Sequence, residues 1–326
     1  MKEAIVRKDT SVNIIHSPVP RPGLGHVLIK VVVAGSNPKD WKLPVISGID
    51  SNSGDDIAGT IEAVGEDVVG FRKGDRVAAS VSAATIPLVA YTSVCALFQQ
   101  LELPEPWGLR SLIIYGASTA TGAFAIKLAA AANIHPIIAV GSKRSEFVKP
   151  FLDETKGDIL VDYTAYPTEN ELVQAIQDAV KTSGAPDGRC WKAYDTVSED
   201  ETVRLLTKVL AGPPNTAAAV AAAGQRPKVV NIFMKTEVPG SDPSVDIVFA
   251  MVAQVHSPDE NDKLIGVAWG AVFTRGLRQG WLTAHPYTVA TDGLESLSEG
   301  LRNLKDGKIR GQKFLTRPGE TPGASG

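Results

Sequence analysis

The segment with the most chemical meaning is residues 112–122, which read Leu-Ile-Ile-Tyr-Gly-Ala-Ser-Thr-Ala-Thr-Gly. An apolar run typical of a strand ends at Gly116, a turn of small residues follows, and a helical pattern of apolar residues begins near Phe124. A strand, a tight turn and a helix in this order form the entrance of a dinucleotide site, where backbone N–H groups at the helix N-terminus bind the diphosphate. The segment therefore predicts a nucleotide-binding protein and, from that, a redox enzyme.

This fingerprint lacks one of its usual glycines. Gly116 and Gly122 are present, but Thr119 stands at the middle position. A threonine is small, and its hydroxyl could donate a hydrogen bond to a phosphate oxygen. An ordinary buried strand and turn would also explain such a pattern, so the prediction needs support from a second element.

That support comes from the next apolar run, Pro136-Ile-Ile-Ala-Val140, and the residues that follow it. An NAD site has an Asp or Glu about twenty residues beyond the glycines, where it binds the ribose 2′-hydroxyl. Lys143 and Arg144 stand there instead, between Ser142 and Ser145. Cations and hydroxyls suit a 2′-phosphate, so we predict NADPH as the cofactor. The alternative is that the two cations only begin a solvent-facing helix.

Composition limits the kind of protein. The chain has 326 residues, 44% hydrophobic and 21% charged, which predicts two globular domains. A net charge of −3 without a basic stripe argues against a nucleic-acid partner, and no run reaches the apolar length of a membrane span. With two cysteines and no apolar signal-peptide core at the N-terminus, we predict a cytoplasmic protein.

The elements that would position the site change character along the chain. The first hundred residues contain strand patterns at 26–34, 57–64 and 77–79, punctuated by glycine, proline and asparagine, as in a compact barrel. From about residue 108, strands alternate with helices. Beyond the two strands above, we expect strands at 158–162, 191–197 and 228–233 and helices at 169–181 and 200–210. Repeated βα units predict an α/β fold with a doubly wound parallel Rossmann sheet.

The C-terminal part returns to a helix at 293–305 and a strand at 313–315, and residues 319–326 read as a disordered tail. Residues 212–227 are rich in alanine and proline, and read either as a surface loop or as a short added helix.

Several segments together resemble the medium-chain dehydrogenase/reductase superfamily, in its zinc-independent quinone and enoyl reductase branch. The chain is most similar there to the fungal trans-acting enoyl reductases that serve polyketide synthases, the lovastatin enoyl reductase type. The segments that carry the resemblance are 25–31, 37–42, 54–59, 70–77, 118–121, 162–163 and 280–287. The resemblance implies a GroES-like substrate domain from residues 1–100 with 271–326, a Rossmann domain at 101–270, and NADPH between them.

The resemblance also implies which residues surround the cofactor. The nicotinamide side would be lined by Lys39, Asp40, Trp41, Lys42 and Thr92. The diphosphate would be held by Ser118, Thr119, Ala120 and Thr121, and the adenosine 2′-phosphate by Ser142, Lys143, Arg144, Ser145 and Tyr163. Ile232, Phe233 and Phe314 would contact the cofactor from later strands.

One departure from the family pattern concerns the substrate domain. After residues 74–79, family members continue through further strands before the helix that begins here near Ser82, whereas the two segments are nearly fused here at Ser80-Val81. A few dozen residues that complete the barrel are therefore absent, either from the protein itself or from this chain. Their loss would leave neighbouring backbone groups without partners and put activity in doubt, while the nucleotide fold would survive.

Metal chemistry is not expected. Cys95 and Cys190 are too few for structural zinc, the five histidines have no ligand spacing, and Asn37 stands near the position where zinc-dependent members have a cysteine. Without a metal to polarise an alcohol, hydride transfer to an activated C=C bond is favoured over alcohol oxidation. Asn37 and Lys42 are candidate polar contacts near the nicotinamide, with Asp40 orienting Lys42, although the same loop would also serve a purely structural role. No catalytic acid is assigned.

The sequence thus predicts an NADPH-dependent reductase of an enoyl thioester, enone or quinone, with a small-molecule or carrier-bound unsaturated carbonyl as substrate. A polyketide synthase is the candidate partner, in secondary metabolism. One alternative is a non-catalytic, crystallin-like NADPH-binding protein, and another is an interaction module with a vestigial nucleotide fold.

Overall fold

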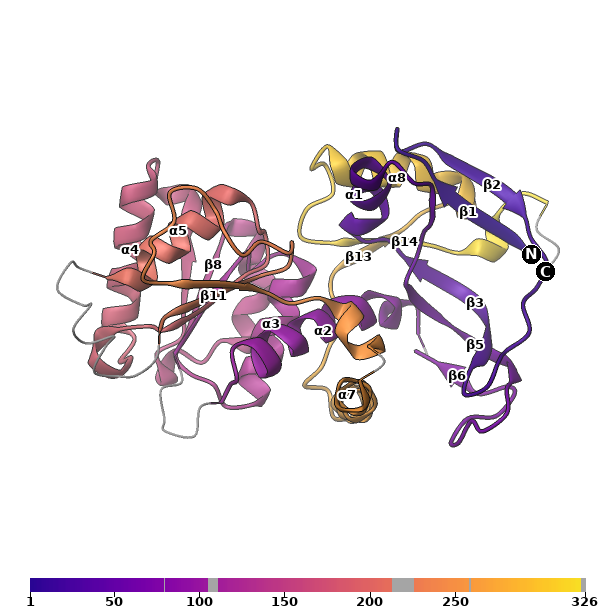
Figure 1. Cartoon of the computed structure of the whole chain (residues 1–326), viewed down its shortest axis with the longest axis horizontal. Coiled ribbons are helices and arrows are strands. Elements are labelled where there is room, and N and C mark those ends of the chain that lie inside the picture. Colours follow the sequence, from indigo (N-terminus) through magenta and orange to yellow (C-terminus); the bar gives the residue numbers. More distant parts are fainter. Residues whose placement is uncertain (79, 105–110, 213–225, 258, 324–326) are drawn as a thin grey trace. The chain divides into compact units, whose positions relative to one another are not determined.

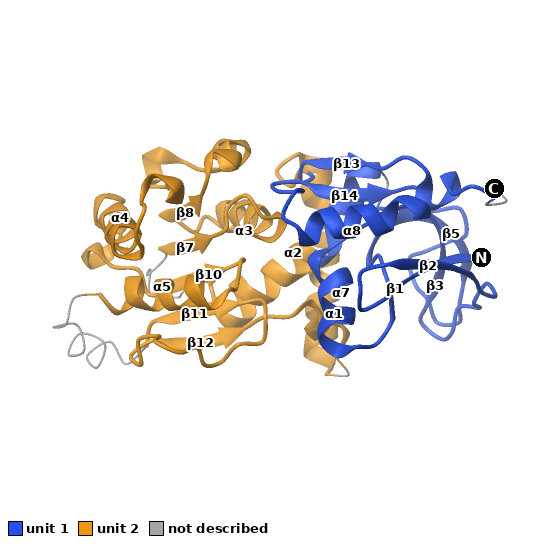
Figure 2. Ribbon diagram, turned by 90° about the horizontal axis from the view of Figure 1, so that it is seen from above, with its two compact units in different colours: residues 1–88, 284–326 blue, residues 89–283 orange. Residues whose placement is uncertain are grey.

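The computed structural model describes residues 1–78, 80–104, 111–212, 226–257 and 259–323. The chain forms two compact units, Met1–Leu88 with Ala284–Gly326, and Val89–Thr283 (Figures 1 and 2). The first unit thus contains both ends of the chain. These units divide at other residues than the expected domain boundaries near 100 and 270, and the assignment of substrate and cofactor domains stays a prediction.

The second unit is built on a six-stranded parallel sheet of strand order β12-β11-β10-β7-β8-β9. Its strands are β7 (Leu112–Tyr115), β8 (Ile137–Gly141), β9 (Ile159–Asp162), β10 (Lys192–Asp195), β11 (Lys228–Asn231) and β12 (Asp246–Phe249). This is the doubly wound Rossmann order, in which the chain turns back between β7 and β10. The predicted fold class is confirmed, and β12 is a sixth strand that the sequence pattern did not indicate.

Every residue of β7, β8 and β10 is buried, which shows that both faces of this sheet are covered. Helices provide this cover. The helices of this part are α2 (Pro87–Val94), α3 (Ala120–Ala131), α4 (Glu169–Thr182), α5 (Asp200–Ala211) and α7 (Glu260–Gln279). Apolar residues of α4 and α5 share one core with Ile113, Ile138 and Val140 of the sheet. Thr168 and Glu171 form a capping box at the N-terminus of α4, so the helix begins at Glu169. This is the start expected for the helix at 169–181.

The first unit contains two smaller sheets. One has the order β13-β14-β3-β5-β6 and the other β2-β1-β4. Their strands are β1 (Lys2–Val6), β2 (Val12–His16), β3 (Val27–Gly35), β4 (Ser51–Asn52), β5 (Asp56–Val64), β6 (Arg76–Val77), β13 (Tyr287–Val289) and β14 (Lys313–Thr316), with helices α1 (Pro38–Ser47) and α8 (Leu297–Lys305). Because β14 pairs with β3, the C-terminal segment completes a sheet begun near the N-terminus.

Strand β6 lies just before the place where we expect the family pattern to be interrupted. It is only two residues long and pairs with β5 at Gly59 and Thr60, and the short helix η1 (Val81–Thr85) follows at once. Among the described residues, no further strand lies beyond β6 in this sheet.

The expectation of a disordered tail from residue 319 is wrong for its first part. Thr321 is buried, and its hydroxyl accepts a hydrogen bond from the Leu294 N–H at 2.9 Å and donates to the Pro318 carbonyl at 2.7 Å. Most of the segment 212–227 lies outside the described residues.

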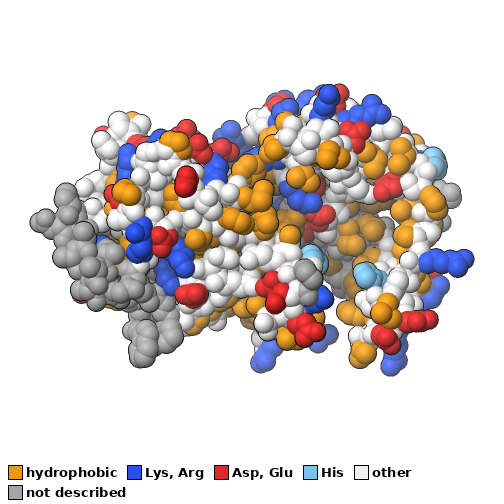
Figure 3. All heavy atoms as spheres, viewed as in Figure 1, with side chains coloured by type: hydrophobic (Ala, Val, Ile, Leu, Met, Phe, Trp, Pro, Cys, Tyr) orange, Lys and Arg blue, Asp and Glu red, His pale blue; other side chains and the backbone are white. Residues whose placement is uncertain are grey.

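Two surface properties bear on partners. On the face shown in Figure 3, Lys and Arg side chains are interspersed with Asp and Glu. Within the described part of the chain, no helix has the length and apolarity that a membrane span needs.

Candidate functional site

The turn between β7 and α3 has a backbone that only glycine fits at two positions. Gly116 has φ +88°, and a Cβ there would lie 2.5 Å from the Thr196 Oγ1. A Cβ on Gly122 would lie 2.3 Å from the Gly116 carbonyl oxygen. The first turn of α3 therefore packs directly on the end of β7, as the predicted dinucleotide turn requires.

Thr119 holds this turn together from inside. Its Oγ1 accepts a hydrogen bond from the Gly122 N–H at 2.9 Å and lies 2.8 Å from the Thr196 Oγ1. Thr196 donates its hydroxyl hydrogen to the Tyr115 carbonyl at 2.8 Å, so Thr119 is the donor in the pair of hydroxyls. The hydroxyl that we expected to reach a phosphate is thus engaged within the protein. Thr196, on the loop after β10, is a residue that the sequence pattern missed.

The backbone at the start of α3 is suited to an anion. Ala120 and Thr121 are the first two residues of the helix, whose N–H groups have no intrahelical acceptor. Ser118, Thr119 and Ala120 are half-exposed, so a ligand can reach them. The helix dipole adds partial positive charge at this end, and the turn lies where the strand order reverses. These features fit a dinucleotide diphosphate.

The four residues after β8 divide into two pairs. Ser142 and Ser145 form a capping box, in which the Ser142 N–H donates to the Ser145 Oγ at 3.2 Å and the Arg144 N–H to the Ser142 Oγ at 3.3 Å. Ser145 is fully buried, beneath a Gly141 that has no room for a Cβ. Lys143 and Arg144 are exposed. The serines therefore shape the turn, and the cations are presented to solvent.

Tyr163 lies beside this turn, at the end of β9. It is 39% exposed, and its ring stacks on Tyr115 with centroids 6.4 Å apart. Its neighbour Asp162 accepts two hydrogen bonds from Thr164, and these, with the charge of Lys143, lower the pKa of the Asp162 carboxyl. The structure thus brings Lys143 and Tyr163 to adjacent strand ends, with one carboxylate between them.

Two buried polar residues, which the sequence pattern missed, shape the loops at the remaining strand ends. At the end of β10, the Asp195 carboxylate accepts hydrogen bonds from the N–H groups of Val197 and Ser198, both at 2.9 Å, and from the Thr202 hydroxyl. Burial raises the pKa of Asp195 to about 6. A polar residue directly after a buried apolar run is the signal that could have identified it.

Asn231 shapes the loop at the end of β11. Its Nδ2 donates to the carbonyls of Lys235 and Val248 at 2.7 and 2.8 Å, and its Oδ1 accepts from the N–H groups of Phe233 and Lys235. All four hydrogen-bonding positions of the amide are used. They hold Ile232, half-buried, and Phe233, 39% exposed, at the same edge of the sheet as the glycine turn.

The predicted nicotinamide residues on α1 are tied up in local contacts. Lys39 pairs with Asp55, and Lys42 lies 5.7 Å from the centroid of the Trp41 ring. Asp40 does not orient Lys42 as expected, because its carboxylate caps α1 by accepting the Asn37 N–H at 2.8 Å. Two further predicted cofactor contacts also lie in packed surroundings: Thr92 is buried in α2, and Phe314 packs against Gly300 of α8.

Asn37 belongs to a buried polar network rather than to an open surface. Its Nδ2 donates to the Asp56 carboxylate at 2.9 Å, and its Oδ1 accepts from Lys313 Nζ at 2.8 Å. Lys313 also pairs with Asp56, which accepts the Leu88 N–H at 2.6 Å. The amide of Asn37, our candidate polar contact near the nicotinamide, is therefore engaged at both its nitrogen and its oxygen in holding β3, β5 and β14 together.

Comparison with known proteins identifies the family. The sequence profile of the alcohol dehydrogenase GroES-like domain matches residues 23–137. The trans-enoyl reductase fsr4 of Gibberella fujikuroi is 34% identical, over 89% of this chain and 90% of the relative. The chain belongs to the trans-enoyl reductases of the medium-chain dehydrogenase/reductase superfamily. It is therefore an oxidoreductase, of a superfamily that uses a nicotinamide cofactor.

Further relatives agree with this assignment. The trans-enoyl reductase resD of Aspergillus sclerotiorum is 26% identical, over 92% of this chain and 95% of the relative. The crystal structure of CurK enoyl reductase shares the fold, with a TM-score of 0.72 at 18% identity, covering 97% of this chain and 98% of the other. The resemblance to this superfamily expected from the sequence motifs is confirmed.

The match to fsr4 also bears on the segment that we expect to be absent from the substrate domain. The alignment runs over 327 positions although only 89% of the 326 residues take part, so the relative has a few dozen residues without a counterpart here. Their place near Ser80 stays a prediction.

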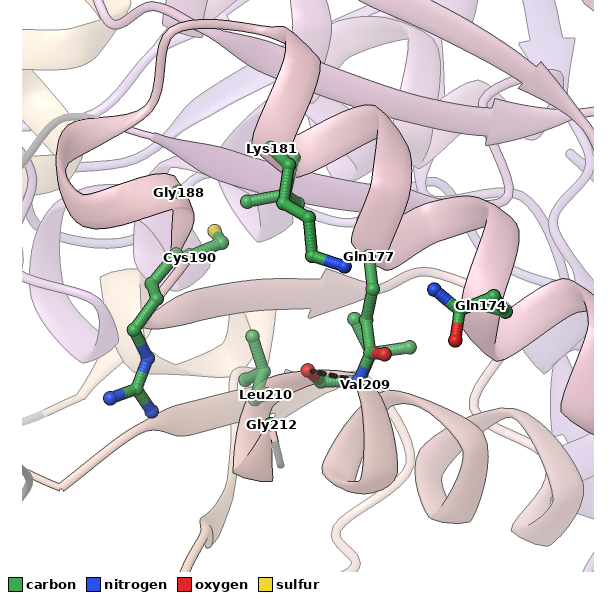
Figure 4. Close-up of a pocket in the computed structure, with 10 residues that line it drawn as sticks. Gln174, Gln177, Lys181, Gly188, Cys190, Val209, Leu210 and Gly212 are labelled. Carbon is green, nitrogen blue, oxygen red and sulfur yellow. Dashed lines mark hydrogen bonds between the residues drawn. The ribbon is translucent and has the colours of Figure 1, made fainter. Parts of the chain in front are cut away.

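A pocket in the second unit lies away from the glycine turn. It has a volume of about 360 Å³ and is lined by residues of α4 and α5 and by Cys190, which precedes β10 (Figure 4). Gln177 extends across it to the Val209 carbonyl at 3.3 Å. Because Cys190 stands at the starting end of the strands and Gly116 follows their finishing end, this pocket is no part of the candidate site.

The buried carboxyl of Asp40 predicts a pH-dependent stability. Burial raises its pKa to about 6 from the ordinary 3.8, and its Oδ1 has no hydrogen-bond partner among the described residues. Between these values the folded protein binds more protons than the unfolded one, so the free energy of unfolding falls as the pH rises from about 4 to about 6.

Asp40→Asn keeps the helix cap but cannot ionise. We expect the stability of this variant, relative to the parent protein, to improve by about 3 kcal/mol between about pH 4 and pH 7, because two pKa units correspond to that free energy. Urea unfolding at several pH values measures the difference, and Asp195 contributes equally to both proteins. A difference that stays constant with pH would contradict the assignment.

Proposed function

We propose that this chain is an NADPH-dependent reductase that transfers hydride to the β-carbon of an activated C=C bond in an enoyl thioester, enone or quinone. The observation that carries the proposal is the turn from Gly116 to Gly122, whose close-packed glycines and helix N–H groups without an intrahelical acceptor suit a diphosphate. The names of the relatives support the enoyl substrate. The bound nicotinamide would supply the hydride, and the protein would position it and stabilise the enolate charge.

The choice of NADPH rests on the turn after β8. The exposed side chains of Lys143 and Arg144 offer charge to a 2′-phosphate, and none of the four residues that follow β8, 142–145, is an Asp or Glu that could bind a ribose 2′-hydroxyl. The half-exposed Ser142 adds a hydroxyl, and Tyr163 offers an aromatic face for the adenine side. Asp162 weakens the positive field without cancelling two cations.

We propose that the reaction needs no metal. Asn37 stands near the position of the zinc-ligating cysteine in metal-dependent members of the superfamily, and its amide is occupied by Asp56 and Lys313. Within the described ranges, no group of three or more His, Cys, Asp or Glu side chains could hold a metal ion.

For the substrate, we favour an enoyl thioester on a carrier protein, with a polyketide synthase as the partner. The relatives are named as trans-enoyl reductases, and one enoyl-reductase-fold neighbour, a cyclopropanase, comes from the curacin A biosynthetic pathway. The short β6 favours the alternative of a non-catalytic NADPH-binding protein, because it is what we expect if part of the substrate side of the barrel is absent.

The decisive experiment combines calorimetric titration with NADPH and turnover assays on short enoyl thioesters, enones and quinones. Binding followed by loss of NADPH absorbance with one substrate class is the expected result. Binding without turnover on any class would favour the non-catalytic alternative. Absence of binding would overturn the proposal as a whole.

The hydroxyl pair of Thr119 and Thr196 provides a more local prediction. Thr196→Val removes the hydrogen-bond partner of the Thr119 hydroxyl and of the Tyr115 carbonyl. A buried polar group left without its partner costs about 1–3 kcal/mol of free energy. We expect NADPH affinity to fall roughly tenfold, since a loss of 1.4 kcal/mol has that effect. Thr196→Ser keeps the hydroxyl and should bind as the parent does. Equal binding by the valine variant would show that the pair does not shape the turn.

A further inference from the structure

The loop between β10 and α5 lies between two parts of the candidate site. In the sheet, β10 stands between β7, which ends at the glycine turn, and β11. The loop is hydrogen-bonded to both neighbours. Thr196 donates its hydroxyl hydrogen to the Tyr115 carbonyl on one side, and the Ser198 hydroxyl accepts the Ile232 N–H at 2.9 Å on the other. Residues 196–198 therefore connect the proposed diphosphate turn with the loop after β11.

Ser198 is held in place by Asp195. The Ser198 N–H donates to the Asp195 carboxylate and the Ser198 hydroxyl to the Asp195 carbonyl, both at 2.9 Å. Ser198 is only 2% exposed, so its hydroxyl gives one hydrogen bond and accepts another away from solvent. Of these two bonds, the one with Ile232 reaches a different strand. The side chain is thus a fixed link between the ends of β10 and β11.

The backbone of Ser198 is strained, with φ +62°. Residues that have a Cβ rarely adopt this region, whereas glycine does so without steric cost. Strained residues persist where the surrounding structure holds them, and they gather at functional sites. A serine in this conformation indicates that its hydroxyl contributes something that glycine could not, and the bond to the Ile232 N–H is such a contribution.

The place of this bond relates it to one half of the coenzyme. The cations proposed for the 2′-phosphate, Lys143 and Arg144, follow β8, which lies on the far side of β7 from β10. A dinucleotide whose diphosphate lies at the glycine turn then extends its other half over β10 toward β11. That half carries the nicotinamide, whose orientation decides the rate of hydride transfer. Ile232 and Phe233, at the end of β11, are its predicted contacts.

We propose that Ser198 is a positioning residue for the nicotinamide half of the coenzyme. Its hydroxyl fixes the Ile232 N–H, and with it the loop after β11, relative to the diphosphate turn. Asn231 holds the same loop from within its own strand, through the N–H groups of Phe233 and Lys235, so Ser198 supplies the link to the neighbouring strand. The inference rests on the proposed function, because it concerns the same coenzyme site.

Hydrogen exchange tests the link without any coenzyme. Ser198→Ala and Ser198→Gly both remove the hydroxyl, and only the glycine variant also relieves the backbone strain. Ser183→Ala is the matched control, because the hydroxyl of this buried serine also donates to a carbonyl and accepts an N–H, those of Val180 and Ala185. The Ile232 N–H should exchange at least about tenfold faster in both Ser198 variants and at the parent rate in the control. Parent-like exchange in either Ser198 variant would overturn the proposal.

Two ligands separate the halves of the coenzyme. Adenosine 2′,5′-bisphosphate has the adenosine end alone, whereas NADPH also has the nicotinamide half. In calorimetric titrations, both Ser198 variants should lose about tenfold in NADPH affinity and stay within about twofold of the parent for the bisphosphate. Ser183→Ala should bind both ligands as the parent does. Thermal melts establish that the variants are folded, and the glycine variant, relieved of strain, keeps the test available if the alanine variant does not fold.

The outcomes distinguish this inference from the proposed function. A parallel change in the two affinities, or no change in either, is what a purely structural serine would give, and would overturn the inference while leaving the coenzyme site in place. A parent protein that binds neither ligand would overturn the proposed function and the role of Ser198 with it.

Discussion

Gly116→Ala should abolish measurable NADPH binding and hydride transfer while leaving a folded protein. An alanine at φ +88° is strained by about 1 kcal/mol, and its Cβ would also lie 2.5 Å from the Thr196 Oγ1 and 3.0 Å from Val197. The turn must open to relieve this contact, and opening it moves the Ala120 and Thr121 N–H groups from the proposed diphosphate position. We expect at least about a hundredfold loss of affinity, which corresponds to roughly 3 kcal/mol.

Gly184→Ala is the matched control. Gly184 also has a positive φ, +78°, in the same unit, but an added Cβ would meet nothing within 4 Å. Both variants therefore carry the backbone strain, and only the first carries the clash at the turn. Calorimetric titration with NADPH and thermal unfolding of the two variants separate binding from stability. If both lose affinity equally, the turn is not where the coenzyme binds.

The second large effect is expected from Lys143→Glu combined with Arg144→Glu. Both side chains are exposed, so the substitutions do not disturb the core, and the Ser142–Ser145 capping box beneath them is kept. Two carboxylates in their place, next to Asp162, would repel a 2′-phosphate. We expect NADPH affinity to fall on the order of a hundredfold and NADH affinity to change by less than about threefold, because only NADPH carries that group.

A charge-matched control is Lys149→Glu combined with Lys156→Glu, two exposed lysines of the same unit with acidic neighbours of their own. It changes the net charge equally, so it measures the long-range part of the effect, which salt screens. Competition titrations with both coenzymes give the ratio. A parallel loss for NADPH and NADH in the first pair would refute the role of these cations in discrimination.

The local pattern of the chain was enough to predict the elements and the family. The apolar runs that we read at 112–115 and 136–140 correspond to β7 and β8, and the helices expected after Gly122 and from residue 169 correspond to α3 and α4. These features depend on residues within a few positions of one another, so a strand, a turn or a helix start can be inferred from sequence alone. Membership of the superfamily followed from several such segments in a fixed order.

Other features depended on residues far apart in the chain. Asn37 and Asp40 stood in a promising polar loop, but Lys313, 276 residues away, engages the first, and the second caps its own helix. Thr321 was assigned to a tail, yet Leu294 binds its hydroxyl. The short-range pattern contains no information on which distant strand supplies the partner.

By itself, the sequence determined that a glycine turn followed by a helix occurs after Tyr115 and that two cations follow the next strand. Only the tertiary structure decided that the Thr119 hydroxyl turns inward to Thr196, that Ser145 is buried beneath Gly141, and that the Ser198 hydroxyl accepts the Ile232 N–H. The physical reason is that backbone conformation follows from neighbouring residues. The partner of a polar group, and the burial of a side chain, follow from what the rest of the chain packs against it.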